Sequence, residues 1–388
     1  MQSILITSKS SLSALGHNSD EIWANYLSQK TNLSICCFND MDTPTGRLQA
    51  ETLALIDDLR KENPLYRRLD KSVLMGIIAG RNTLSKANWT DLSTVGINMG
   101  SSRGATQLFE KYHAHFINSP NQRISPLTSP TTTLGNIASW MAFDFGTEGA
   151  TLTHSITCST ALHSILNACV WIKSGMTDKF IAGGTEAPLT DFTISQMRSL
   201  GVYSKNTSGW YCSPMKKGNT KNNMVLGEGA AVFCLESDQG QEHLAKIIGL
   251  GYATEKIEHP ASLSADASCL KKSMQMALDD SKLKTVDAIV MHAPGTILGD
   301  QSEHTAITSV FGEQTPHLIS TKHQSGHTFG ASGGISLDLA VEMLSRKHLI
   351  QFPYDTEITQ KQSAPKSILI NAVGFGGNAV SIIVQKTD

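Results

Sequence analysis

Short apolar runs recur along the chain, and segments between several of them repeat apolar residues at helical spacing. The length and apolar character of the runs predict strands that are buried on both faces. From residue 337 onward, apolar residues follow a helical period while Asp338, Glu342 and Arg346 share another face, which predicts a surface-covering helix. This alternation predicts an α/β fold with largely parallel sheets, whose ligands gather where strands end. The predicted strands span residues 4–7, 95–99, 180–182, 288–292, 368–373 and 380–384.

The chain divides near its middle. Residues 204–223 are rich in Ser, Asn, Gly and Lys and show no periodicity, which predicts a long irregular connection. A second series of strand and helix patterns starts at about residue 246. We therefore expect two halves, residues 1–240 with a candidate nucleophile and residues 241–388 with candidate catalytic histidines.

Composition narrows the class of protein. With 388 residues, 40% hydrophobic and 17% charged, the chain is expected to form a well-packed globular protein. A net charge of -2 gives no general attraction for nucleic acid, and no apolar run is long enough for a membrane helix. The seven cysteines show no paired metal-ligand spacing. We expect a soluble protein in the reducing cytoplasm, without a metal site.

Cys158 is the candidate nucleophile. The alternating segment 150–157 predicts a strand, and the helical pattern behind Cys158 runs to Gly175, a plausible helix end. A cysteine at such a junction lies near a helix amino terminus, which lowers the thiol pKa and favours the reactive thiolate. The alternative is an inert buried cysteine, which is our interpretation of Cys169.

Further chemistry is concentrated in three glycine-bounded segments of the second half. His292 ends a predicted strand and is followed by Thr296, Asp300 and Glu303; a second segment holds Lys322 and His327. The third, residues 371–377, holds Gly374, Phe375 and Gly376. Because a lone histidine is more often a hydrogen-bonded structural group, His154, His163 and His323 keep that interpretation.

These segments together carry a family resemblance. Residues 156–162, Ile-Thr-Cys-Ser-Thr-Ala-Leu, resemble the nucleophile segment of β-ketoacyl synthases. Residues 181–186, residues 225–230 and the three segments above follow in the family's order across nearly the whole chain. The resemblance implies a thiolase-like fold, with two pseudo-repeated halves in five αβαβα layers, normally assembled as a homodimer or as a ketosynthase heterodimer.

The same resemblance implies the reaction and the roles of residues. Cys158 would take the acyl group of a thioester, and His292 and His327 would hold the enolate formed when malonyl-acyl carrier protein loses carbon dioxide, in a decarboxylative Claisen condensation. Lys322 would help to keep the histidines neutral and connect to acidic groups. Substrate binding is implied for Phe375 as acyl-pocket gate and for Thr296, Gly374 and Gly376; structural support is implied for Glu303, Asp300 and Glu228. The backbone N–H groups of Cys158 and Phe375 would hold the oxyanion. No cofactor is expected, because the partner acyl carrier protein carries the phosphopantetheine.

Departures from the family pattern keep other functions open. Ala293 and Pro294 stand where the family usually continues with glycine and threonine, and Asn378 and Ala379 replace threonine and asparagine. These changes favour a specialised synthase of fatty acid, polyene or polyketide biosynthesis, such as one that elongates aryl polyene or pigment precursors. The alternative is a noncatalytic subunit like a chain-length factor, against which the retained Cys158 argues. A thiolase would carry a second cysteine near its carboxyl terminus, yet none follows Cys269.

Overall fold

The computed structural model describes residues 3–119, 121–256 and 263–386. Within these residues, ten strands form one continuous sheet in the order β10-β9-β11-β12-β8-β1-β7-β6-β4-β5. The first half supplies β1 (Ile4–Leu12), β4 (Gly96–Gly100), β5 (Thr151–Leu152), β6 (Lys179–Glu186) and β7 (Gly229–Ser237). The second half supplies β8 (Ala245–Thr254), β9 (Ala288–Val290), β10 (His317–Ile319), β11 (Ser367–Gly374) and β12 (Asn378–Gln385).

The two halves have the same topology. From the outer edge inward, each half places its strands in the order third, second, fourth, fifth and first along the chain. The outer three strands pair in parallel in both halves, and the inner pairings are antiparallel in both. The halves meet where β1 pairs antiparallel with β8. This repetition, which spans both halves, confirms the predicted pseudo-repeated architecture.

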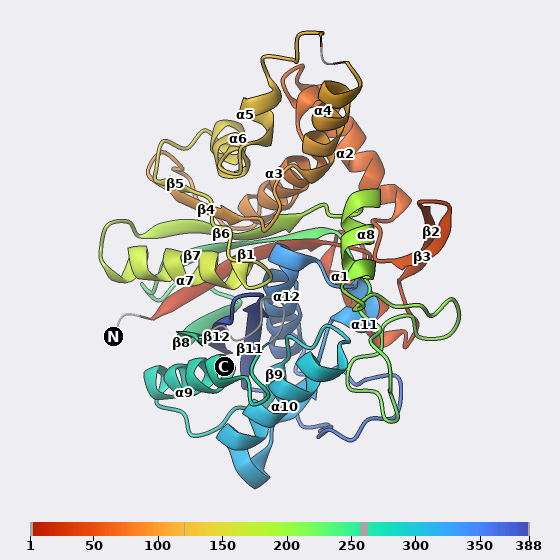
Figure 1. Cartoon of the computed structure of the whole chain (residues 1–388). Coiled ribbons are helices and arrows are strands. Elements are labelled where there is room, and N and C mark those ends of the chain that lie inside the picture. The colour runs from red at the N-terminus through yellow and green to blue at the C-terminus, as the bar shows by residue number, and fades with distance from the viewer. Residues whose placement is uncertain (1–2, 120, 257–262, 387–388) are drawn as a thin grey trace.

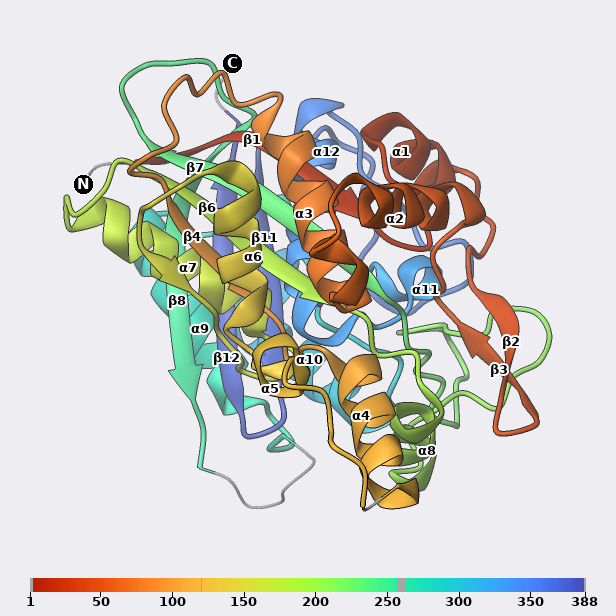
Figure 2. The ribbon, with the colours of Figure 1, turned by 90° about the horizontal axis from the view of Figure 1, so that it is seen from above.

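Helices complete five layers, which Figure 1 shows from the side, while Figure 2 looks onto one outer helical layer. One outer layer contains α2 (Ala50–Glu62), α3 (Lys71–Leu84) and α6 (Asn136–Phe145), and the other contains α9 (Ser268–Ser281) and α10 (Ile297–Phe311). Between the two parts of the sheet lie α7 (Thr160–Lys173) and α12 (Ser332–Ser345), which contact each other. The αβαβα prediction is therefore confirmed.

Further elements lie in the connections. They are α1 (Ser19–Leu27), β2 (Ser34–Phe38), β3 (Met41–Thr45), η1 (Tyr66–Arg68), α4 (Thr106–Asn118), α5 (Thr128–Thr132), α8 (Asp191–Ser199), η2 (Gly312–Gln314), α11 (Lys322–Ser325) and η3 (Phe329–Ala331). The connection 204–223 is irregular, as predicted, and forms only isolated bridges in the part of the chain that the structure describes.

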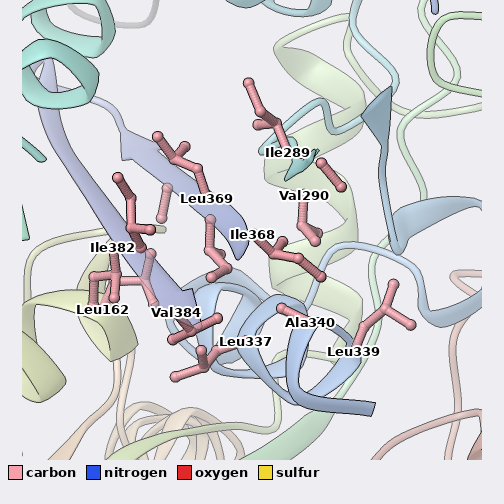
Figure 3. Packing of buried hydrophobic residues seen from close by; sticks show 14 of the residues in the cluster. Leu162, Ile289, Val290, Leu337, Leu339, Ala340, Ile368, Leu369, Ile382 and Val384 are labelled. Carbon is pink, nitrogen blue, oxygen red and sulfur yellow. The ribbon is translucent and has the colours of Figure 1, made fainter. Parts of the chain in front are cut away.

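The helix predicted after residue 337 is present, but its predicted position at the surface is wrong. It is α12, and its residues 332–344 are all buried in the middle layer, where Leu337 and Ala340 pack beside Ile368 of β11 and Val384 of β12 (Figure 3). Two of its three charged residues are buried too, since Lys9 on β1 reaches Asp338 and Glu342 at 2.7 and 2.8 Å, whereas Arg346 follows the helix and is exposed. The polar stripe therefore bonds to the other half of the molecule, whereas the pattern alone suggested contact with water.

Two further predictions need correction, although all six predicted strands are present. The sheet is mixed, because the fifth strand of each half turns back antiparallel beside the fourth. Of the strand predicted over 150–157, only β5 forms. Farther along, the amide of Ile156 donates a hydrogen bond to the hydroxyl of Thr160 at 2.8 Å, within the turn that leads into α7. Threonine side chains compete with strand pairing by bonding to nearby backbone, which explains the short strand.

Candidate active site

Cys158 lies in a tight turn directly before α7. The preceding Thr157 has φ +45°, a conformation that is rare for a β-branched residue. Gly374, at the end of β11, packs against this turn: a Cβ atom there would lie 1.7 Å from Thr157 Oγ1 and 2.9 Å from the backbone nitrogen of Cys158. Thr157 Oγ1 also donates to the carbonyl of Phe375 at 3.4 Å. The glycine-rich segment therefore meets the candidate nucleophile from the other half of the chain.

The prediction that Cys158 has a lowered pKa is wrong for the unliganded protein. Part of the residue is accessible, but the thiol lies deep enough for burial to raise its pKa to about 12, and the negative charge of Glu186 adds to this. Lys322 and Arg103 act in the opposite direction. Loss of solvation of the thiolate outweighs the stabilising groups, so the free protein holds a neutral thiol.

His292 and His327 lie face to edge, with ring centroids 5.1 Å apart and planes at 85°. His292 follows β9, and Glu303 on α10 fixes this loop by accepting hydrogen bonds from the amides of His292 and Ala293 at 2.9 and 2.7 Å. His327 is held through its backbone, because its amide donates to the carbonyl of Val225 at 2.6 Å. Two distant segments thus bring the predicted histidines together.

Both histidines are neutral near pH 7. Burial lowers the pKa of His327 to about 3, and it lowers the pKa of His292 well below the ordinary range. The nearby positive charge of Lys322 contributes to both shifts. Within the described residues, the buried Nδ1 atoms of both rings have no hydrogen-bond partner. A pair of neutral imidazoles with unused polar atoms is suited to bind an oxygen of a substrate.

Lys322 begins α11 and is almost completely buried. Its ammonium group donates to the carbonyl of Met291 at 3.4 Å and to the hydroxyl of Ser336 at 3.3 Å. Burial lowers its pKa to about 8, while the negative charges of Glu303 and Asp300 oppose that shift. Among the ion pairs of the described residues, none joins Lys322 to Glu303, so these two groups interact through space.

Asp300 and Thr296 lie where the His292 loop enters α10. The carboxylate of Asp300 accepts from the amides of Gly295 and Thr296 at 3.1 and 3.2 Å, and burial raises its pKa to about 7. Thr296 is the N-cap residue of α10 and is partly buried. These contacts shape the loop between β9 and α10.

Glu228 lies apart from the histidines. Its carboxylate pairs with Lys71 of α3 at 2.5 Å and accepts from the amide of Leu48 at 3.1 Å. Its neighbour Gly227 reaches the site instead, because the Gly227 amide donates to the carbonyl of His327 at 3.1 Å. Phe375 and Gly376 occupy the turn between β11 and β12, where Phe375 is 43% exposed and Gly376 has φ +91°.

The structure also places residues that the sequence did not single out. The guanidinium of Arg103 lies 5.4 Å from the ring centroid of Phe329, which is itself 5.5 Å from the ring of His327. The backbone N–H of Asn223 donates a hydrogen bond to the carbonyl of Gly295 at 2.8 Å. This bond holds the irregular connection against the His292 loop. The signal available in the sequence was the position of Arg103 four residues after the end of the predicted strand 95–99.

The pseudo-repeat relates the two central helices at this site. Thr157 and Phe329 each lie three residues before the start of their helix, α7 or α12, and both have positive φ, +45° and +42°. Cys158 in the first half therefore corresponds to Gly330 in the second. The corresponding strained turns therefore carry the thiol of Cys158 in the first half and Gly330, which has no side chain, in the second.

In the described residues, no group of three or more His, Cys, Asp and Glu side chains could hold a metal ion. Over residues 3–119, 121–256 and 263–386, no helix is both long and apolar enough to cross a membrane.

Comparison with known proteins gives consistent results. Among curated proteins, a 3-oxoacyl-[acyl-carrier-protein] synthase 2 of Staphylococcus aureus is 26% identical, with 99% of this chain and 98% of the relative covered. Among solved structures, the ishigamide ketosynthase/chain length factor has a TM-score of 0.87 at 18% identity, with both chains covered completely. A ketosynthase in complex with its chain length factor from Xenorhabdus doucetiae has a TM-score of 0.82 at 21% identity, over 100% of this chain and 98% of that one. These likenesses establish the thiolase-type fold.

Family models identify the chain itself. The model described as the N-terminal domain of β-ketoacyl synthases matches residues 1–240, and the model described as their C-terminal domain matches residues 244–352. Together these matches cover most of the chain, so the protein belongs to the β-ketoacyl synthase family of condensing acyltransferases.

Proposed function

We propose that this chain is an elongating β-ketoacyl-acyl carrier protein synthase in which Cys158 carries the growing acyl group. The observation that carries the proposal is the pair of neutral histidines, His292 and His327, 5.1 Å apart beside the buried Lys322. The phosphopantetheine arm of an acyl carrier protein delivers the substrate, so the chain itself needs no cofactor.

The first half-reaction is a thioester exchange. The sulfur of Cys158 attacks the carbonyl of an acyl thioester, and the carrier thiol leaves with the proton, so that one thioester replaces another. The backbone N–H groups of Cys158 and Phe375 hold the tetrahedral oxyanion. The close approach of Gly374 to the backbone nitrogen of Cys158 supports this assignment.

The second half-reaction forms the carbon-carbon bond. Malonyl thioester loses carbon dioxide, and the imidazole N–H groups of His292 and His327 stabilise the enolate oxygen. The enolate carbon attacks the acyl carbonyl on Cys158, and the released thiolate recovers a proton. Neutral imidazoles suit this step because their N–H groups donate hydrogen bonds to the enolate oxygen and are too weakly acidic to protonate the enolate.

Mass spectrometry of the intact protein tests the proposal. After incubation with acyl-loaded carrier protein, we expect the mass of one acyl group on Cys158, lost in C158A and retained in C169A, whose cysteine lies in the core. H327A should keep the adduct while malonyl decarboxylation falls about a hundredfold. If no acyl donor gives an adduct, a noncatalytic role like that of a chain-length factor becomes the better account.

The acyl substrate of this enzyme is proposed to be specialised, of the polyene or polyketide type. The support is the Ala293-Pro294 and Asn378-Ala379 departures; Asn378 accepts a hydrogen bond from Thr254 at 3.1 Å and so faces β8. Competition between saturated and polyunsaturated acyl carriers of equal length tests this. Preference for the polyunsaturated chain is expected, and equal or better use of the saturated chain would refute specialisation.

We also propose how the chain assembles and in which compartment it acts. We expect docking of an acidic carrier protein and pairing with a second chain of this fold, either identical or related. The seven unpaired cysteines fit the reducing cytoplasm. Measurement of the mass in solution, alone and with carrier protein, tests both associations.

A further inference from the structure

Glu186, the last residue of β6, is a fully buried carboxylate for which the proposed reaction has no role. Its Oε1 accepts from the hydroxyl of Ser101 at 2.8 Å and the amide of Arg103 at 3.1 Å. Its Oε2 accepts from the amide and hydroxyl of Ser102 at 2.8 and 2.5 Å and from the amide of Gly330 at 3.0 Å. Burial raises the pKa of Glu186, but the five donors around its carboxyl group oppose that shift and match an ionised acceptor.

These hydrogen bonds join the two halves of the chain. Residues 101–103 follow β4 in the first half, while Gly330 belongs to the strained turn before α12 in the second. The contact is close, since a Cβ atom at Gly330 would lie 2.6 Å from the amide nitrogen of Ser102. Arg103 strengthens the join because its guanidinium stacks over the ring of Phe329.

The turn that Glu186 holds contacts the reactive groups. The ring of Phe329 lies 5.5 Å from that of His327 and belongs to the buried cluster against which Cys158 packs. Phe329 has φ +42°, which is unfavourable for an aromatic residue and persists only where the surroundings impose it. The hydrogen bond from Gly330 to Glu186 is one such constraint.

We propose that Glu186 is a positioning residue for the condensation, because its carboxylate fixes loop 101–103 against turn 329–330 and thereby sets Phe329 beside His327 and Cys158. This inference rests on the proposed function. It adds a buried anion from the first half to the groups that organise the site.

The charge of Glu186 gives the inference a specific readout. After burial, its negative charge is the main cause that raises the pKa of the Cys158 thiol. Replacing Glu186 by glutamine removes that charge, so the thiol should ionise at lower pH while the turn loses its anchor. In this variant, alkylation of Cys158 should therefore become faster while condensation becomes slower. Loss of a merely structural residue would not produce these opposite changes.

The experiment compares E186Q with D287N in the full-length protein. Asp287 is a matched control, because its Oδ2 also accepts three hydrogen bonds, from the amides of Lys366 and Ser367 and the Ser367 hydroxyl, at the opposite end of β11 from Gly374. Iodoacetamide alkylation of Cys158 for a fixed time is followed by peptide mass mapping from pH 6 to 10, and condensation is assayed with acyl and malonyl carriers. The alkylation midpoint is the pH at which half of the thiol has reacted in that time; below the thiol pKa it moves with that pKa, because the reaction rate follows the thiolate fraction.

For E186Q, we expect the alkylation midpoint to fall by about half a pH unit or more and the condensation rate to fall about tenfold or more. D287N should keep the wild-type midpoint and rate. An unchanged midpoint and an unchanged rate in E186Q overturn the inference. Loss of acylation in the wild type would instead overturn the proposed function.

A second variant decides the matter if E186Q does not fold. S102A removes the hydroxyl donor but leaves the carboxylate and its charge in place. Condensation slowed about threefold or more, with the alkylation midpoint unchanged, supports the positioning role. Wild-type condensation in S102A overturns it.

Discussion

Individual residues in the site have their ionisation set by burial. Cys158, His292, His327 and Lys322 all shift toward their neutral forms, since an ion loses solvation in a buried site. Near pH 7 the thiol and both imidazoles are neutral, whereas Lys322, with a pKa of about 8, is still mostly protonated. This pattern suits a reaction whose negative charge appears only transiently on an enolate or oxyanion. It also makes stability depend on pH.

Replacement of His327 by asparagine should weaken that dependence. Folded His327 has a pKa of about 3, whereas an unfolded histidine titrates near 6.5, so the unfolded chain binds an extra proton as pH falls below 6.5. The wild type therefore loses stability on acidification, by about 1 kcal/mol from this residue between pH 7.5 and 5.5. Urea unfolding at both pH values should show a smaller loss in H327N.

His323 provides the comparison. Burial lowers its pKa to about 4, and its Nδ1 contacts the carbonyl of Ser320 at 2.7 Å, away from the proposed chemistry. H323N should reduce the pH dependence of stability to a similar degree yet retain condensation, which H327N should not. Identical pH dependence in wild type and H327N would contradict the assigned neutral state.

Secondary-structure elements position the nucleophile through close backbone contact. The end of β11 approaches the turn before α7 so closely that only a residue without a side chain fits at Gly374. The glycine-rich segment is visible in the sequence, but the sequence does not show that Thr157 is the residue that needs this space. That contact joins residues more than two hundred positions apart.

Alanine at Gly374 should displace the turn that carries Cys158. Its Cβ would overlap Thr157 Oγ1, so acylation of Cys158 should slow about a hundredfold while the protein remains folded. Stopped-flow acylation with circular dichroism measures both effects. The control is G135A, because Gly135 has helical φ of -62° and no atom within 4 Å of a new Cβ; equal rates in G374A and wild type would refute the argument.

At the scale of the whole molecule, a buried ion pair joins the two halves. Lys9 on β1 belongs to the first half, while Asp338 and Glu342 lie on α12 of the second. Glu342 also pairs with Arg346 at 2.7 Å, which leaves Asp338 most dependent on Lys9. The two halves therefore share polar as well as apolar contacts through the middle layer.

Methionine at Lys9 should destabilise the whole chain. The change leaves Asp338 buried and uncompensated, which typically costs about 3–5 kcal/mol, and the double variant K9M/D338L should recover much of that loss. Urea unfolding measures both. K61M, which removes an exposed pair with Asp58, should leave the unfolding midpoint unchanged; a K9M midpoint equal to wild type would show that the buried pair contributes nothing.

The sequence alone determined six of the ten strands of the large sheet, the candidate nucleophile, the histidine motifs and the family, because these depend on local apolar period and short ordered motifs. Only the tertiary structure decided the ionisation of Cys158 and the burial of Asp338 and Glu342 on α12, since both depend on what surrounds a residue. The contacts of Glu186 belong to this second group: a carboxylate after a strand has no visible function until folding brings Ser102 and Gly330 to it. Local order along the chain predicts elements, whereas solvation and long-range contact arise only in the folded molecule.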